Sequence, residues 1–251
     1  MLIVVTGGAG SGKSALAERY AIGLAQEAKC TPVYIATMRR DPDDPETEAI
    51  IRRHREMRAG KGFITYELPC GIRQATESDG RFGLYGKEAG EACISEEGTI
   101  KRSGCAEEGM INRAECTEEE TIKRLEYADG VTPSRRVYLL EDLPNLLANE
   151  LWSEGGAMAE TAGSIRDPVA DTVGTAALSA ELERELTMPL LKLSEEADLV
   201  IVTGDVHSEG GAADAWTDLY MQLLGKAGRA LATSADRVVE AVSGVPVVLK
   251  T

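Results

Sequence analysis

One stretch near the start of the chain decides the fold: Gly7-Gly8-Ala9-Gly10-Ser11-Gly12-Lys13-Ser14, preceded by the apolar run Leu2-Ile3-Val4-Val5. A glycine, four further residues and then Gly-Lys-Ser is the spacing of a phosphate-binding loop, in which backbone N–H groups and a helix N-terminus face an anion. The lysine adds a cation, and the serine hydroxyl binds the Mg²⁺ that accompanies a nucleotide. We therefore predict that residues 7–14 bind a nucleotide and that Lys13 is catalytic. An ordinary glycine-rich turn is the alternative.

The composition argues against several classes of function. A net charge of −15 over 251 residues argues against a nucleic-acid partner, because phosphates would be repelled over most of the surface. No apolar run approaches the roughly 18 residues of a membrane span, and the chain opens on a strand-like segment and not on a signal peptide. The five cysteines contain no CxxC pair, so neither disulfides nor a zinc site are expected. These features predict a cytoplasmic enzyme with no membrane span.

Apolar segments alternate with helical segments along the chain, which predicts an α/β fold with a mostly parallel sheet flanked by helices, similar to P-loop NTPases. The predicted strands cover residues 2–6, 32–36, 63–67, 137–141, 199–203, 237–242 and 245–249. The predicted helices cover residues 13–28, 45–58, 143–151, 175–196 and 213–233. We expect residues 1–251 to form a single nucleotide-binding domain.

The interval 71–133 interrupts this alternation. It contains nine glycines, fourteen acidic and eight basic residues, with little apolar periodicity. Compact domains rarely contain so long a stretch without regular structure. We therefore predict an acidic, glycine-rich insertion at the surface, whose deletion would leave the core fold intact.

Two apolar strands end in carboxylates of the kind that a phosphoryl-transfer site uses near its metal. One ends in Glu141-Asp142, and the other runs through Thr203-Gly204 to Asp205. Asp142 is equally suited to cap the next helix, and Asp205 to make a turn. Glu141 is harder to explain in this way, because it falls at the strand tip itself.

The predicted helix 45–58 carries His54, one of only two histidines in the chain. A half-buried packing residue is one interpretation of it. The other is an imidazole nucleophile, which is available in its neutral form near pH 7. Phosphates bound beside it would be neutralised by four arginines of the same helix, which are Arg52, Arg53, Arg55 and Arg58. His207 follows the later acidic strand end, and a surface loop explains it equally well.

Further short motifs accompany the phosphate loop. They are Ile35-Ala36-Thr37, His54-Arg55-Glu56-Met57-Arg58, Phe63-Ile64-Thr65-Tyr66-Glu67, Leu139-Leu140-Glu141 with Asn149, and Ser243-Gly244-Val245-Pro246 with Lys250. In this order, the series resembles the bifunctional adenosylcobinamide kinase/adenosylcobinamide-phosphate guanylyltransferase family of cobalamin biosynthesis. The matching motifs span most of the chain outside residues 71–133.

The resemblance implies a two-step activity. Adenosylcobinamide would be phosphorylated by a nucleoside triphosphate, ATP or GTP, and GMP would then be transferred from GTP through a guanylylated histidine. His54 would be that histidine, Mg²⁺ would accompany the nucleotides, and the protein would be a homotrimer. The implied guanine-nucleotide site is lined by Ala36, Thr37, Met38, Arg55, Glu56, Met57, Arg58, Glu67 and Glu141.

The chain also departs from the family pattern. Gly10 replaces an arginine of the family's loop, and the family's Thr-Asn-Glu-Val-Gly reads Thr203-Gly204-Asp205-Val206-His207. Two alternatives therefore stay open, namely a P-loop kinase with another small-molecule hydroxyl as its substrate and a non-catalytic nucleotide-binding module. The chain lacks the Asn-Lys-x-Asp motif of signalling GTPases and the Leu-Ser-Gly-Gly-Gln signature of transport ATPases.

Overall fold

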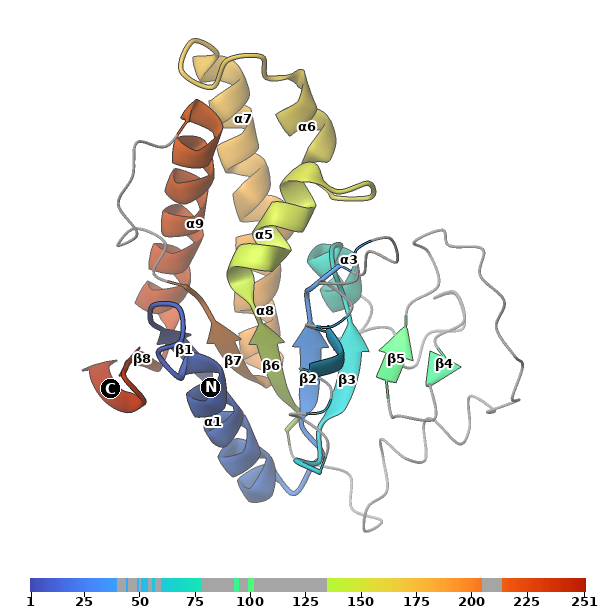
Figure 1. The fold of residues 1–251 in the computed structure, drawn as a ribbon, viewed down its shortest axis with the longest axis vertical. Coiled ribbons are helices and arrows are strands. Elements are labelled where there is room, and N and C mark those ends of the chain that lie inside the picture. The colour runs from blue at the N-terminus through green and yellow to red at the C-terminus, as the bar shows by residue number, and fades with distance from the viewer. Residues whose placement is uncertain are drawn as a thin grey trace.

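The computed structural model describes residues 1–39, 44, 49, 51–53, 56, 60–77, 93–94, 99–101, 135–204 and 214–251. These residues form a single sheet with helices on both faces (Figure 1). None of the helices in these ranges is long and apolar enough to cross a membrane.

The described strands form a nine-stranded sheet in the order β4-β5-β3-β2-β6-β7-β1-β8-β9. Neighbouring strands are parallel except for the outermost pair at each edge, β4–β5 and β8–β9. This arrangement confirms the predicted α/β fold and its mostly parallel sheet. The strands are β1 Leu2–Thr6, β2 Val33–Ala36, β3 Ile64–Glu67, β4 Cys93–Ile94, β5 Thr99–Lys101, β6 Val137–Glu141, β7 Asp198–Val202, β8 Arg237–Val242 and β9 Val245–Lys250.

Helices cover both faces of the sheet because its central strands are apolar on both sides. Successive residues of a strand point to opposite faces. Ile3 and Val5 of β1 therefore pack with α1, whereas Leu2 and Val4 face the larger core formed with α3 and α5–α9. The helices are α1 Lys13–Ala28, α3 Ile72–Glu77, α5 Leu143–Trp152, α6 Ala159–Ser164, α7 Thr172–Leu182, α8 Met188–Glu196 and α9 Ala215–Ser234, with a π-helical turn η1 at Glu183–Thr187.

The predicted helix 175–196 is longer and less regular than expected. It begins at Thr172, because the Asp171 side chain accepts a hydrogen bond from Gly174 N at 2.8 Å and caps the first turn. It continues through α7, η1 and α8 without a break in the chain. The π-helical turn lies just before Pro189, which has no N–H and whose ring would clash with the carbonyl of Glu185 in a regular α-helix.

The first part of the predicted insertion belongs to the core. Helix α3 was not predicted, yet its residues Ile72 and Ala75 are fully buried. Strand β5 extends the sheet by pairing in parallel with β3. The predicted boundary at residue 71 is therefore wrong, because this interval contributes a buried helix and two edge strands. A surface insertion within the rest of residues 71–133 and the single-domain organisation stay predictions.

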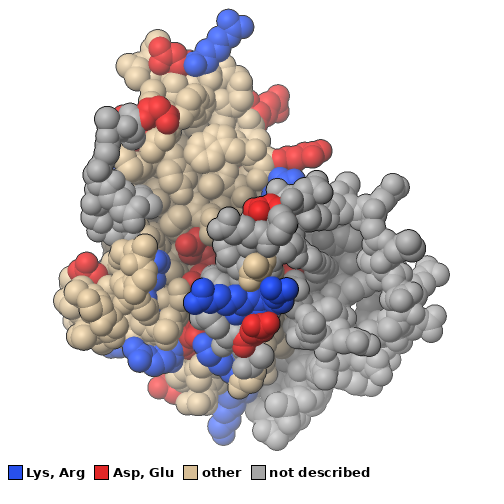
Figure 2. Space-filling model, in the orientation of Figure 1, with Lys and Arg blue, Asp and Glu red and all other residues tan. Residues whose placement is uncertain are grey.

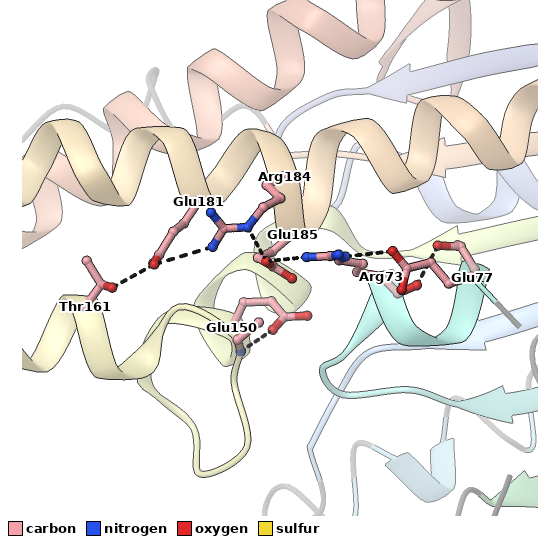
Figure 3. A network of polar contacts seen from close by, with 9 residues as sticks. Arg73, Glu77, Glu150, Thr161, Glu181, Arg184 and Glu185 are labelled. Carbon is pink, nitrogen blue, oxygen red and sulfur yellow. Dashed lines mark hydrogen bonds and ion pairs between the residues drawn. The ribbon is translucent and has the colours of Figure 1, made fainter. Parts of the chain in front are cut away.

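A polar network holds α3 in place (Figure 3). The carboxylate of Glu150 is fully buried and accepts hydrogen bonds from the backbone N–H of Gly71 at 2.6 Å and of Ala157 at 2.8 Å. Burial raises the pKa of Glu150, and these hydrogen bonds oppose part of that rise. Arg73 of α3 reaches Glu185 of η1 at 3.0 Å. Glu150 thus connects α5 to the start of α3 and to the loop before α6.

We predict that Glu150→Ala destabilises the fold by about 2–4 kcal/mol, because it leaves buried backbone N–H groups without an acceptor. Urea unfolding of the variant and of the parent protein measures this difference. The matched control is Glu154→Ala, since Glu154 is exposed in the turn that follows α5. Its loss is expected to change stability by no more than about 0.5 kcal/mol. Equal stability of the two variants would contradict the structural role given to Glu150.

Candidate nucleotide-binding site

The loop between β1 and α1 curls around the N-terminus of the helix. Its backbone has positive φ at Gly7 (152°), Gly10 (68°) and Gly12 (87°), a region that favours glycine. The N–H of Ser11 donates to the carbonyl of Gly8 at 3.2 Å, which closes the turn. This is the local geometry that residues 7–14 were predicted to form.

Two of these glycines are required by neighbouring backbone as well as by their φ angles. A Cβ at Gly7 would lie 2.7 Å from the carbonyl oxygen of Ala241 in β8. A Cβ at Gly12 would lie 3.3 Å from the Cα of Gly244, in the turn after β8. The sequence suggested that the glycines make room for a ligand, whereas the structure shows that they also make room for the C-terminal strands.

Two polar groups of the loop suit an anionic ligand. The Lys13 ammonium donates to the carbonyl of Gly8 at 3.3 Å and so reaches back across the loop. The Ser11 hydroxyl is buried and has no hydrogen-bond partner among the described residues. A buried polar atom of this kind costs free energy unless it is satisfied. Both observations fit a loop whose polar groups are completed by phosphate oxygens.

Ser14, in the first turn of α1, contacts the tip of β6. Its hydroxyl donates a short hydrogen bond to Glu141 Oε1. The other oxygen of the same carboxylate accepts from the Tyr34 hydroxyl at 3.0 Å. Hydroxyl and carboxylate oxygens are the protein ligands that Mg²⁺ takes together with substrate phosphates. Glu141 and Ser14 therefore form a donor pair that fits a nucleotide-bound magnesium ion.

Both carboxylates at this strand end have a raised pKa. Burial raises the pKa of Glu141, although the hydrogen bonds from Ser14 and Tyr34 oppose the rise. Burial also raises the pKa of Asp142, and the nearby charge of Lys13 partly offsets this effect. A bound cation would favour the ionised form of both groups.

Asp142 begins the following helix. Its side chain accepts a hydrogen bond from Asn145 N at 2.9 Å, so it is the N-cap of α5. Burial, together with the charge of Asp142, raises the pKa of Tyr220 to about 12. The capping role that the sequence left open for Asp142 is therefore confirmed, while its place beside Lys13 keeps it within the site.

Thr37 holds the Glu141–Asp142 segment in position. It is fully buried, and its hydroxyl accepts from Asp142 N at 2.8 Å and lies 3.0 Å from the Glu141 carbonyl. The Asn149 side chain donates to the Thr37 carbonyl at 2.8 Å. The contacts of Thr37 thus connect β2, β6 and α5. A nucleotide contact of Thr37 stays a prediction.

The parallel register aligns several predicted site residues at one edge of the sheet. Ala36 of β2 pairs with Glu67 of β3 on one side and with Glu141 of β6 on the other. Met38 follows two residues after Ala36. The carboxyl ends of parallel strands form the usual ligand-binding edge of an open α/β sheet. The predictions for these residues therefore agree with their common location, and binding itself stays a prediction.

Some of the residues named from the sequence lie outside the described part of the chain. His54, Arg55, Met57, Arg58, Asp205 and His207 lie outside the described residues. Residues 49, 51–53 and 56 are helical, as predicted for this segment, with Ile51 buried and Arg52, Arg53 and Glu56 exposed. Gly10, which replaces the family's arginine, has open space around its Cβ position.

Sequence reasoning missed two participants in this site, Tyr34 and Gly244. The only signal for Tyr34 in the sequence is that it places an aromatic hydroxyl in an otherwise aliphatic strand. The sequence does not indicate that this hydroxyl donates to Glu141. Gly244 belongs to a motif that the resemblance highlighted, but its contact with the loop depends on the sheet order.

Basic side chains are present on the face that carries the loop in spite of the acidic composition. Most of the Lys and Arg side chains on the face shown in Figure 2 lie in its middle and lower part, with acidic side chains between them. The surface above them is mostly tan, with acidic side chains along its edges. Local cations of this kind lower the cost of binding a polyphosphate to a chain of net charge −15.

The part of the chain that the structure describes offers no group of three or more His, Cys, Asp or Glu residues that could hold a metal ion. Cys30 and Cys70 are reduced thiols, and burial raises the pKa of Cys30. Cys105 and Cys116 lie outside the described ranges.

The fold and the site define an α/β protein with a phosphate-binding loop at the carboxyl edge of a parallel sheet. Residues 3–83 match the profile of the family described as cobinamide kinase / cobinamide phosphate guanyltransferase. This similarity agrees with the resemblance found in the sequence, and the matched range includes the loop, α1 and His54. The motifs after residue 83 lie beyond it.

The other comparisons add little. No curated protein sequence matches the chain. Among solved structures, the flagellar accessory protein FlaH from Methanocaldococcus jannaschii aligns at 12% identity over 99% of this chain and 77% of that chain, with a TM-score of 0.38. A score this low does not establish a common fold, so the fold class rests on the strand order described above.

We predict that Gly7→Ala weakens nucleotide binding about 5- to 150-fold, because the new Cβ must displace the Ala241 carbonyl and the φ angle is strained, at a cost of about 1–3 kcal/mol. Gly163→Ala is the matched control, since a Cβ at Gly163 also meets nothing within 4 Å and this glycine lies in α6, outside the loop. Calorimetric titration with Mg-GTP and with Mg-ATP measures both affinities. If the two variants bind equally well, the packing of β8 against the loop does not shape the site.

Proposed function

We propose that the protein is a bifunctional enzyme of cobalamin biosynthesis that phosphorylates adenosylcobinamide and then transfers GMP to the product. The observation that carries the proposal is a phosphate loop that lies inside the family-matched range and is joined through Ser14 to Glu141. We further propose that Mg²⁺ accompanies the nucleotides, that ATP or GTP is the phosphoryl donor, and that the protein is a cytoplasmic homotrimer, as the family resemblance implies.

The kinase step would use the groups around the loop. Lys13 and the backbone N–H groups of the loop would bind the phosphates of the donor and stabilise the charge that develops on the transferred phosphoryl group. Ser14 and Glu141 would hold the magnesium ion, which when bound draws charge from the phosphate oxygens. Asp142 lies close enough to Lys13 to feel its charge, and it would accept the proton of the attacking hydroxyl.

The guanylyl step would use His54. An imidazole nitrogen would attack the α-phosphorus of GTP, forming a P–N bond while the bond to the β-phosphate oxygen breaks and pyrophosphate leaves. A phosphate oxygen of adenosylcobinamide phosphate would then attack the same phosphorus, which breaks the P–N bond and restores the histidine. Arg55 and Arg58, on the same predicted helix, would neutralise the phosphates in both steps. The matched range 3–83 includes this segment and supports the assignment.

A second candidate is a P-loop kinase that acts on a small-molecule hydroxyl without guanylyl transfer. It is favoured by two observations. Gly10 takes the place of the loop arginine, and the family match ends at residue 83. This candidate keeps the roles of Lys13, Ser14 and Glu141 but gives none to His54.

We predict that incubation with Mg²⁺ and α-labelled GTP, without cobinamide, attaches the label to the protein. The covalent bond that holds the label is expected to be cleaved by acid and stable to base. His54→Ala is expected to abolish this label, because the nucleophile is removed, while the kinase step is largely retained. His207→Ala, which removes the only other histidine, is the matched control and is expected to keep the label. Lys13→Ala is expected to impair both steps. Absence of label on protein that binds GTP would favour the second candidate.

We predict that Glu141→Gln raises the Mg²⁺ concentration needed for half-maximal kinase activity at least about tenfold, because one anionic ligand is lost. The amide still accepts from Ser14 or Tyr34, so folding is expected to persist. Activity measured across a magnesium titration tests this, with Glu160→Gln, at an exposed position of α6, as the control. An unchanged magnesium requirement would remove Glu141 from the metal site.

A further inference from the structure

The C-terminal hairpin touches the phosphate loop at three backbone positions. The N–H of Gly244 donates to the carbonyl of Ser11 at 2.8 Å. The backbone of Gly244 packs against Gly12, and the carbonyl of Ala241 packs against Gly7. These contacts involve both ends of the loop, and they come from the Ser243-Gly244 turn and the end of β8.

The hydrogen bond to Ser11 also orients the next peptide N–H. A trans peptide group points its N–H opposite to its C=O. Because the Ser11 carbonyl is turned toward the hairpin, the N–H of Gly12 is turned away from it. Backbone N–H groups are the part of a phosphate loop that binds the anion. The hairpin contact therefore restricts a group on which anion binding depends.

Strand β9 contributes no buried side chain to the core. All six residues of β9 are exposed, with Val245 at 60% and Leu249 at 59% of their full accessibility. The strand is nevertheless held at both ends. At one end is the tight turn, where Ser243 and Gly244 have φ of 49° and 82°, the left-handed pair that suits a two-residue hairpin. At the other end, the Lys250 ammonium donates to the carbonyls of Thr233 at 2.6 Å and Ala232 at 3.3 Å, at the end of α9.

We propose that the Ser243–Gly244 turn is a positioning part of the nucleotide site, which holds the phosphate loop in its anion-binding shape, and that β9 and Lys250 keep the turn in place. The proposal rests on nucleotide binding by the loop and goes beyond the proposed activity by giving the C-terminal hairpin a role in it. The proposal thereby gives a structural role to the Ser243-Gly244 motif and to Lys250.

Nucleotide affinity of three variants of the full chain tests the proposal. Lys250→Ala removes the anchor that is remote from the loop, and Gly244→Ala strains the turn at a position where a Cβ meets nothing within 4 Å. We expect each to weaken Mg-GTP binding about fivefold or more in calorimetric titration. Lys226→Ala is the matched control, since this lysine likewise donates to a carbonyl, that of Ser179 at 3.1 Å, but is not connected to the hairpin. It is expected to change affinity less than twofold.

Hydrogen exchange provides a readout that does not depend on activity. By thermodynamic reciprocity, Mg-GTP is expected to slow exchange of the Gly244 amide, because the loop that accepts its hydrogen bond becomes more ordered. Affinities unchanged in both hairpin variants, with Gly244 exchange unaffected by nucleotide, would overturn the proposal.

If the parent protein bound no nucleotide, the proposed function would be wrong. Hydrogen exchange of the loop amides would still test whether the hairpin holds the loop in its shape. Faster exchange of the amides of residues 8–13 in Lys250→Ala than in Lys226→Ala would support it, and equal exchange would overturn it. If Gly244→Ala does not fold, the comparison of Lys250→Ala with Lys226→Ala still tests the proposal.

Discussion

The contact between the Ser14 hydroxyl and the Glu141 carboxylate is the interaction on which the site depends. It joins the N-terminus of α1 to the tip of β6, two elements far apart in the sequence that meet because parallel strands direct all their carboxyl ends to one edge. Thr37 and Asn149 stabilise the same strand end from β2 and α5. The phosphate loop supplies groups that suit an anion, and this contact adds two oxygen groups that suit the proposed magnesium ion.

Much of the fold could be predicted, because the physical signals are local. Continuous apolar runs mark the buried parallel strands, and the tip of β6 at Glu141 follows from where its run ends. The phosphate loop was predictable from spacing alone, since its glycines, lysine and serine are adjacent. The start of α5 was predictable as well, because Asp142 and Pro144 are typical of a helix N-terminus.

What could not be predicted depends on residues distant in the chain. Helix α3 was missed because its short sequence sits in a polar, glycine-rich interval, and its burial is made possible by Glu150, whose carboxylate binds the backbone at its start. The contact of Gly244 with Ser11 exists only because β8 lies beside β1. The identity of a glycine gives no indication of which distant backbone approaches it.

The position of β1 within the sheet also has a consequence for how the protein folds. Its two neighbours, β7 at Asp198–Val202 and β8 at Arg237–Val242, both come from the last quarter of the chain. During synthesis from the N-terminus, the strand that leads into the phosphate loop therefore has no pairing partner until β7, which begins at Asp198, has emerged. Such a high contact order is associated with slow folding. Strand β1 is thus translated well before the strands that complete its native environment.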